Sequence, residues 1–145
     1  MFGVTVFCVC ILAISSTNAV DENGKIVEIQ TKTSGEIFAD ISSEAAAHLD
    51  LVICGTTDCC LIDTLSNGNI NFMLGAIDDF FGPDLQGCEN FEMPNNELKL
   101  LKISHRGYDA WLGEFINVSL DSGVYFHCEI TQWLDNDEEV ELACR

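Results

Sequence analysis

The segment from Phe115 to Ile130 alternates between apolar and polar side chains, and this pattern constrains the fold more than any other feature. The apolar positions are Ile116, Val118 and Leu120 before a break, and Val124, Phe126, Cys128 and Ile130 after it. The break is Asp-Ser-Gly at 121–123, which puts Gly where a three-residue hairpin loop requires a positive φ. A period of two indicates a half-buried strand. We therefore predict a β-hairpin with one buried face.

Several other short segments carry strand signals and are separated by turn residues. We expect strands at Lys25–Thr33, Leu49–Ile53, Cys59–Leu65, Ile70–Leu74, Leu98–Ser104 and Val140–Cys144. A change of parity at Leu100–Leu101 predicts a bulge. Residues 75–96, rich in Gly, Pro, Asp and Asn, predict an extended loop, and Glu36–Ala47 fits either a loop or a short capped helix. Seven or eight short strands predict an all-β fold, an antiparallel eight-stranded β-sandwich.

The first residues, Met1–Ala19, have the pattern of a secretory signal peptide. An apolar run from Val4 to Ile14 precedes small and polar residues that end at Ala19. The run is too short to span a bilayer, which takes about 20 apolar residues, and no later stretch is longer. We expect residues 20–145 to form one secreted, extracellular domain and not a transmembrane protein.

Six cysteines lie outside the predicted signal peptide, and an even number in a short secreted chain predicts disulfide bonds. They are Cys54, Cys59, Cys60, Cys88, Cys128 and Cys144. Six cysteines allow about 15 pairings, and the sequence does not choose among them. We single out Cys128–Cys144 as a candidate pair that would join the last two strands. Zinc is not expected, because no Cys-x-x-Cys or matching His pair is present.

The charge of the chain is strongly negative, with 24 acidic and six basic residues and a net charge of −18. A nucleic-acid partner is excluded, because binding phosphates requires a basic surface. Attraction to anionic membranes is disfavoured for the same reason. The charge fits a solvated acidic surface, a cationic partner or a divalent cation.

The order of motifs in the second half of the chain resembles a known family. The run Asn71-Phe72-x-x-Gly75-x-x-Asp78-x-Phe80 is followed by an apolar strand with His and Gly, then by Trp111-Leu112, an apolar strand, Phe126-x-Cys128 and Trp133-Leu134. This order resembles the PLAT (lipoxygenase homology, LH2) domain. The resemblance implies an eight-stranded sandwich that contacts lipid or protein surfaces. In that family a loop after the first strand can hold calcium, and this chain lacks the usual glycine-rich run there.

Aromatic residues near loops are the candidates for partner contact, since an aromatic ring suits an interface that is apolar on one side and wet on the other. We select Phe80, Phe81 and Trp111. The pair Phe80-Phe81 lies in a polar segment and predicts an exposed patch. In the PLAT family the Trp of each Trp-Leu unit mostly packs in the core, which implies a buried Trp133 and also a core position for Trp111.

Calcium is the candidate cofactor, because it takes several oxygen ligands and the chain has three acidic groups. They are Glu36/Asp40/Glu44, Asp78/Asp79/Asp84 and Asp135/Asp137/Glu138. We select Asp40 first and then Asp78 and Asp79 as candidate ligands. No EF-hand loop is present.

No catalytic arrangement is predicted. The chain lacks a Gly-x-Ser-x-Gly elbow, and its cysteines are explained as disulfides. The segment Cys59–Asp63 lacks the His of the secreted-phospholipase motif. A separate motif, Asn117-Val118-Ser119, is a glycosylation sequon with Asn117 on the predicted solvent face.

The sequence thus predicts a secreted, acidic, non-catalytic module that contacts a lipid or protein surface, with calcium as the candidate cofactor. The alternative is a secreted disulfide-rich structural or defence protein that has a protein target and no lipid affinity. A small hydrolase is the least favoured of the three classes.

Overall fold

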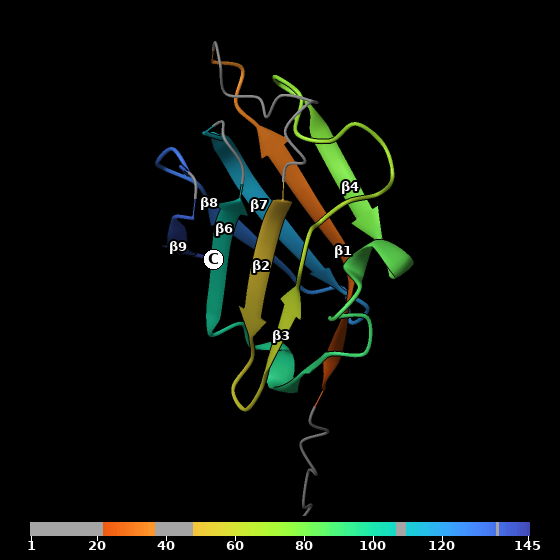
Figure 1. Ribbon diagram of the computed structural model, residues 1–145. Coiled ribbons are helices and arrows are strands. Elements are labelled where there is room, and N and C mark those ends of the chain that lie inside the picture. Colours follow the sequence, from red (N-terminus) through yellow and green to blue (C-terminus); the bar gives the residue numbers. More distant parts are fainter. Residues whose placement is uncertain (1–21, 37–47, 107–109, 136) are drawn as a thin grey trace, which may run out of the picture.

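The computed structural model describes residues 22–36, 48–106, 110–135 and 137–145, which form two facing antiparallel sheets (Figure 1). The first sheet has the order β4-β1-β7-β8, and its strands are β1 (Gly24–Thr33), β4 (Ile77–Phe81), β7 (Gly113–Leu120) and β8 (Tyr125–Glu129). The two-residue β5 (Glu92–Met93) also pairs with β1. The second sheet has the order β3-β2-β6-β9, with β2 (His48–Cys54), β3 (Cys59–Ile62), β6 (Leu100–Arg106) and β9 (Glu139–Leu142). The predicted all-β sandwich is confirmed.

The inner faces of the two sheets share one buried core. Ile29, Ile116 and Val118 of the first sheet and Leu51 and Ile103 of the second are fully buried in the same cluster. Their neighbours along each strand point outward and are more exposed, as in the alternating burial of β7. The apolar positions of each alternating segment therefore face the core, and the polar positions between them face solvent.

The predicted hairpin is present as β7 and β8. Ile116 pairs with Cys128 and Asn117 with His127. Gly123 in the connecting loop has a φ of 87°, the conformation that the Asp-Ser-Gly segment predicted.

Three of the sequence expectations about strands are wrong. Ile70–Leu74 is not a strand, because Phe72 and Gly75 have positive φ and turn the backbone. The fourth strand is β4, inside the segment expected to be a loop. The bulge expected at Leu100–Leu101 is absent, since β6 pairs with β2 in unbroken register. The irregularities instead lie where β1 pairs with β7.

All six cysteines outside the predicted signal peptide form disulfides, as predicted. Cys54–Cys59 and Cys60–Cys88 were not predicted as pairs, and Cys128–Cys144 was. The last bond joins β8 of the first sheet to the residues after β9 of the second, and backbone hydrogen bonds between His127 and Arg145 lie beside it. This bond therefore links the two layers at one side of the sandwich.

Two further 3₁₀ turns, η1 (Gly82–Leu85) and η2 (Pro94–Asn96), lie in the connection from β4 to β6. The predicted signal peptide and most of Glu36–Ala47 fall outside the described residues. Within the described part of the chain, no helix has the length and apolar character needed to cross a bilayer.

Candidate functional site

The aromatic residues selected from the sequence do not form an exposed patch. Phe80 and Trp111 are both fully buried, so neither can contact a partner. Phe80 lies on the inner face of β4, and Phe81, the next residue, lies on the outer face with 50% of its surface exposed. Trp133, expected in the core, is 39% exposed, and the adjacent Leu134 is buried and bridges to Trp111 instead.

Four of the nine large apolar side chains that are exposed among the described residues lie in another segment, between β3 and the first residue of β4. We call this segment the 66–77 loop (residues 66–77; yellow-green to green in Figure 1). Ile70 is 68% exposed, Met73 44%, Leu74 48% and Ile77 54%. Single exposed apolar residues are common on protein surfaces, but four within eight positions of one loop are not. This loop end is the strongest candidate for a contact surface.

Phe72 fixes the middle of the 66–77 loop to the core. Its side chain is 2% exposed and packs against Phe80, with ring centroids 6.0 Å apart, and edge-on against Trp111, at 5.7 Å. Its N–H donates to Oδ2 of Asp78 at 2.7 Å. Phe72 has a φ of 60°, a costly conformation for an aromatic residue, so these contacts must hold the backbone in place.

Asparagine side chains brace the first part of the same loop. Oδ1 of Asn67 accepts from the N–H of Asn69 at 3.1 Å and from Nδ2 of Asn71 at 2.8 Å. Nδ2 of Asn67 in turn donates to the carbonyl of Asp79 at 3.1 Å, which ties the loop to the outer edge of β4. Short polar side chains that bond nearby backbone favour such non-strand conformations.

The second part of the loop is held from β1. The N–H of Gly75 donates to the carbonyl of Ser34 at 3.0 Å, and Nζ of Lys32 donates to the carbonyl of Gly75 at 2.6 Å. Since both halves are bonded to the sandwich, Ile70, Met73 and Leu74 remain exposed on a supported backbone.

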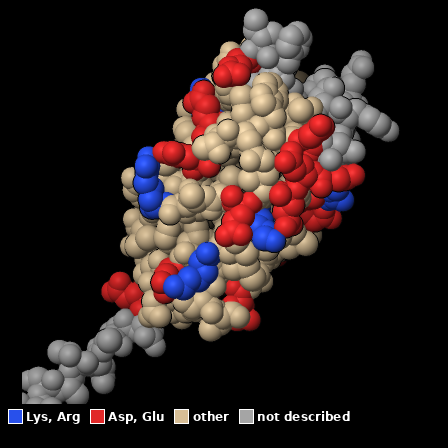
Figure 2. All heavy atoms as spheres, turned by 90° about the vertical axis from the view of Figure 1, so that its left-hand side faces the viewer, with Lys and Arg blue, Asp and Glu red and all other residues tan. Residues whose placement is uncertain are grey.

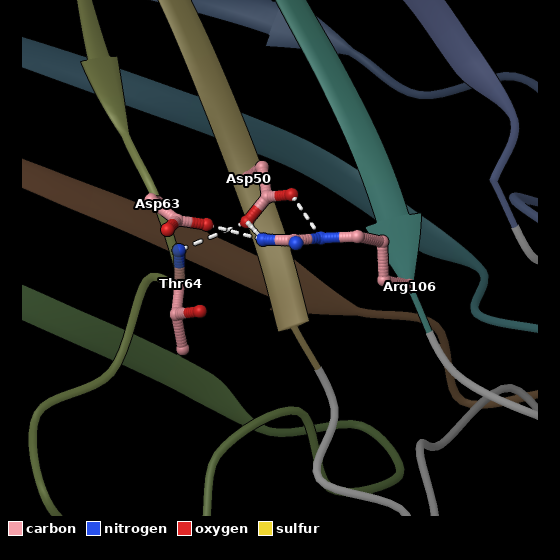
Figure 3. Close-up of polar contacts among 4 residues, drawn as sticks. All are labelled: Asp50, Asp63, Thr64 and Arg106. Carbon is pink, nitrogen blue, oxygen red and sulfur yellow. Dashed lines mark hydrogen bonds and ion pairs between the residues drawn. The ribbon is translucent and has the colours of Figure 1, made fainter.

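A charged cluster on the outer face of the second sheet holds Thr64, two residues before the 66–77 loop (Figure 3). Nε and Nη2 of Arg106 contact the two oxygens of Asp50 at 2.7 and 2.9 Å, and Nη2 also contacts Asp63. Oδ1 of Asp50 accepts from the N–H of Thr64 at 2.9 Å. Thr64 has a φ of 73°, and this bond helps to hold it. The hydrogen bond to Asp50 is the largest cause that raises the pKa of Arg106, followed by the attraction between the two charges.

Each of the six basic side chains has a polar partner within the described residues. Lys25, Lys99, Lys102, Arg106 and Arg145 pair with carboxylates, and Lys32 bonds the carbonyl of Gly75. Figure 2 shows carboxylates spread over one side of the molecule, with the few basic groups lying beside them. The described surface therefore offers no cluster of uncompensated positive charge.

The described residues do not fit a calcium site. Asp78 and Asp79 are neighbours in β4 and point to opposite faces, so their carboxylates cannot share an ion. Asp78 already accepts from the N–H of Phe72, and Asp79 from Nε2 of Gln30 at 2.8 Å. Among the described residues, no group of three or more His, Cys, Asp or Glu is placed to hold a metal. Asp40 lies outside them.

The sequence therefore missed Ile70, Met73, Leu74 and Ile77. The signal that could have found them is the cluster of turn-forming residues around them, which favours a loop over a strand. These residues are Asn67, Gly68, Asn69, Asn71 and Gly75.

Comparison with solved structures supports the PLAT-like fold. The alpha toxin from Clostridium absonum matches with a TM-score of 0.66 and 15% identity over 88% of this chain, and the alpha-toxin from an avian strain of Clostridium perfringens with 0.63 and 16% over 89%. A coral 8R-lipoxygenase, described as activated by calcium through a C2-like domain, matches with 0.64 and 13% over 82%. The expected PLAT-like, C2-like sandwich is confirmed as a fold.

This chain spans only 33%, 34% and 17% of the lengths of those three proteins. No protein-family model matches its sequence. No curated protein matches it either.

Proposed function

We propose that this chain is a secreted, non-catalytic module that docks on a lipid surface through its 66–77 loop. The observation that carries the proposal is the group of exposed side chains Ile70, Met73, Leu74 and Ile77 on a loop held by Phe72. A supported apolar loop can enter the outer part of a bilayer without first losing much conformational freedom. The fold adds support, because a coral lipoxygenase with a similar domain is described as activated by calcium through that domain.

The size of the apolar surface sets a modest affinity. Full burial of one Ile, Leu or Met side chain contributes about 1.5–3 kcal/mol. Since the four side chains are between 44% and 68% exposed, their joint insertion contributes roughly 3–6 kcal/mol before the cost of association. We therefore expect reversible binding that is weaker than that of a single lipid anchor.

The charge of the domain selects the lipid class. A net charge of −18 repels an anionic bilayer, and each basic side chain already has a partner. Each basic residue near a surface would contribute about 1 kcal/mol toward anionic lipids, and this chain has no free group to supply it. A zwitterionic surface, such as one of phosphatidylcholine, fits better than an anionic one.

Vesicle sedimentation of the oxidised protein tests the proposal. We expect binding to phosphatidylcholine vesicles that exceeds binding to vesicles containing phosphatidylserine. Calcium is included as a separate condition, because a site involving Asp40 would make binding calcium-dependent. Failure to sediment with either vesicle, with and without calcium, would refute lipid docking and leave the disulfide-rich protein with a protein target.

A matched pair of variants tests the loop itself. Leu74 and Leu61 are 48% and 52% exposed, but Leu61 lies on β3 of the second sheet. Leu74→Asp should lower vesicle binding at least 3- to 10-fold, from the loss of about 0.7–1.4 kcal/mol of burial. Leu61→Asp introduces the same charge and should bind like the unmodified protein. Equal losses in the two variants would show that overall charge, and not the loop, controls binding.

A further inference from the structure

A row of polar side chains crosses the outer face of the first sheet. Asp79 of β4 is opposite Gln30 of β1, Gln30 is opposite Asn117 of β7, and Asn117 is opposite His127 of β8. Nε2 of Gln30 donates to Asp79 at 2.8 Å, and Nδ2 of Asn117 donates to Oε1 of Gln30 at 3.1 Å. Nδ1 of His127 lies 2.7 Å from Oδ1 of Asn117. We call these four residues the polar row.

Asn117 has hydrogen-bonding capacity that the polar row does not use. Its Oδ1 can only accept, so Nδ1 of His127 must carry the hydrogen of their bond. Its Nδ2 has two hydrogens, and the bond to Gln30 uses one. Among the described residues, the bond to Gln30 is the one that Nδ2 of Asn117 donates. A substituent can therefore replace the second hydrogen while both bonds of Asn117 remain.

The strand that carries Asn117 also presents an aromatic ring beside it. Phe115 is two residues earlier on the same outer face, about 6.6–6.8 Å along the strand, and is partly exposed. Its ring centroid is 5.2 Å from that of His127, which limits its motion toward β8. Saccharides have a face of C–H groups that packs on aromatic rings, and Phe115 offers such a ring beside Asn117.

From these contacts we infer that Asn117 is N-glycosylated, that the first N-acetylglucosamine packs on Phe115, and that the glycan covers the outer face of the first sheet. The sequon is completed by Ser119, whose Oγ lies on the same face and donates to Glu28 at 3.3 Å. The inference rests on the secretion that is part of the proposed function. In the transfer step Nδ2 of Asn117 bonds to C1 of the sugar, the lipid diphosphate of the oligosaccharide donor leaves, and one Nδ2 hydrogen departs as a proton.

The glycan has a consequence for docking. A bulky hydrophilic group above β1 and β7 prevents this face from lying flat on a membrane or a protein. Contact is then directed to the end of the sandwich that carries the 66–77 loop. We expect vesicle binding to remain unchanged when the glycan is removed enzymatically.

The test is secretion of the full chain from a eukaryotic cell, followed by mass mapping before and after treatment with peptide N-glycosidase. We expect a glycan on Asn117 that the enzyme releases with conversion of this residue to Asp. Ser119→Ala should abolish the modification, and Ser119→Thr, which keeps the hydroxyl, should retain it. A secreted chain with unmodified Asn117 overturns the inference, and so does a chain that never enters the secretory pathway.

A second measurement tests the role of Phe115. Removal of the glycan should lower the melting temperature of the glycosylated chain that retains Phe115. The same treatment should lower the melting temperature less in Phe115→Ala. Equal effects would overturn the packing of the sugar on this ring. The vesicle experiments use unglycosylated protein that is oxidised in a bacterial periplasm. Absence of glycosylation at Asn117 and absence of vesicle binding are therefore observed separately. Stronger vesicle binding after glycan removal would show that the sheet face itself contacts lipid.

Discussion

Replacing Phe72 by Ala tests whether one buried ring holds the loop that carries the proposed docking surface. The ring is 2% exposed and contacts both Phe80 and Trp111, so its removal leaves a cavity between the loop and the core. We expect Phe72→Ala to lower the free energy of unfolding and to weaken vesicle binding. The second effect follows because the backbone under Met73 and Leu74 loses its connection to the core.

The magnitude follows from burial. Truncation of a buried Phe to Ala costs about 3–5 kcal/mol, which includes the cavity. This is a large part of the 5–15 kcal/mol that stabilises a typical domain. Phe72 also has a φ of 60°, and an Ala there keeps the cost of the left-handed backbone while losing the contacts that offset it. A destabilisation of this size corresponds to a drop in melting temperature of roughly 10–20 °C.

Phe81→Ala is the matched control. Phe81 is 50% exposed on the outer face of β4, so the same truncation should cost only about 0.7–1.5 kcal/mol. Urea unfolding of the oxidised proteins, followed by tryptophan fluorescence and circular dichroism, gives both values. The midpoint should move strongly for Phe72→Ala and slightly for Phe81→Ala at similar slopes.

Losses of stability that agree within about 0.5 kcal/mol in the two variants would contradict this prediction, because that difference is close to the scatter between independent sites. Phe72 would then not be held in the core. If Phe72→Ala is strongly destabilised but binds vesicles normally at a temperature where it is folded, the loop does not need this support.

Two further predictions concern the ion pair beside the 66–77 loop and the disulfide that links the two sheets. Asp50→Ala should lower the free energy of unfolding in urea by about 1–3 kcal/mol, because its carboxylate is 12% exposed and bonds Arg106 twice. Asp63 is 71% exposed, so Asp63→Ala should lower it by under about 1 kcal/mol. Equal costs would mean that burial does not strengthen this ion pair. Replacing Cys128 and Cys144 together by Ser should cost about 3 kcal/mol, the loop-closure value for a separation of 16 residues, as measured by the shift of the urea midpoint. An unchanged midpoint would show that the sandwich closes without this bond.

The sequence alone predicted the elements whose pattern is local. The hairpin from Phe115 to Ile130 was predicted with its loop and its buried face, and these are observed. The outward position of Asn117 was predicted in the same way. Alternation is a property of neighbouring residues, so a strand that is buried on one side shows it without reference to the rest of the chain.

The same local reasoning failed between β3 and β4. Ile70, Phe72 and Leu74 alternate as in a strand, but the tertiary structure turns the backbone at Phe72 and buries only that side chain. Phe80 and Phe81 were expected to be exposed together, whereas pairing of β4 with β1 puts one on each face. The sequence of residues 70–81 alone predicts neither result. Both depend on groups that are distant in the chain, namely the ring of Trp111 and the backbone of β1.

Local patterns in the chain were enough to predict an all-β sandwich, the oxidation of six cysteines and a strongly negative charge. Two of the three cysteine pairs, and the apolar residues that stay at the surface, became known from the folded structure alone. The reason is that burial of a loop residue depends on distant partners, as when Nε1 of Trp111 donates to Oγ1 of Thr33 at 3.1 Å across 78 positions. Long-range contacts of this kind put Phe72 in the core and leave Ile70, Met73 and Leu74 at the surface.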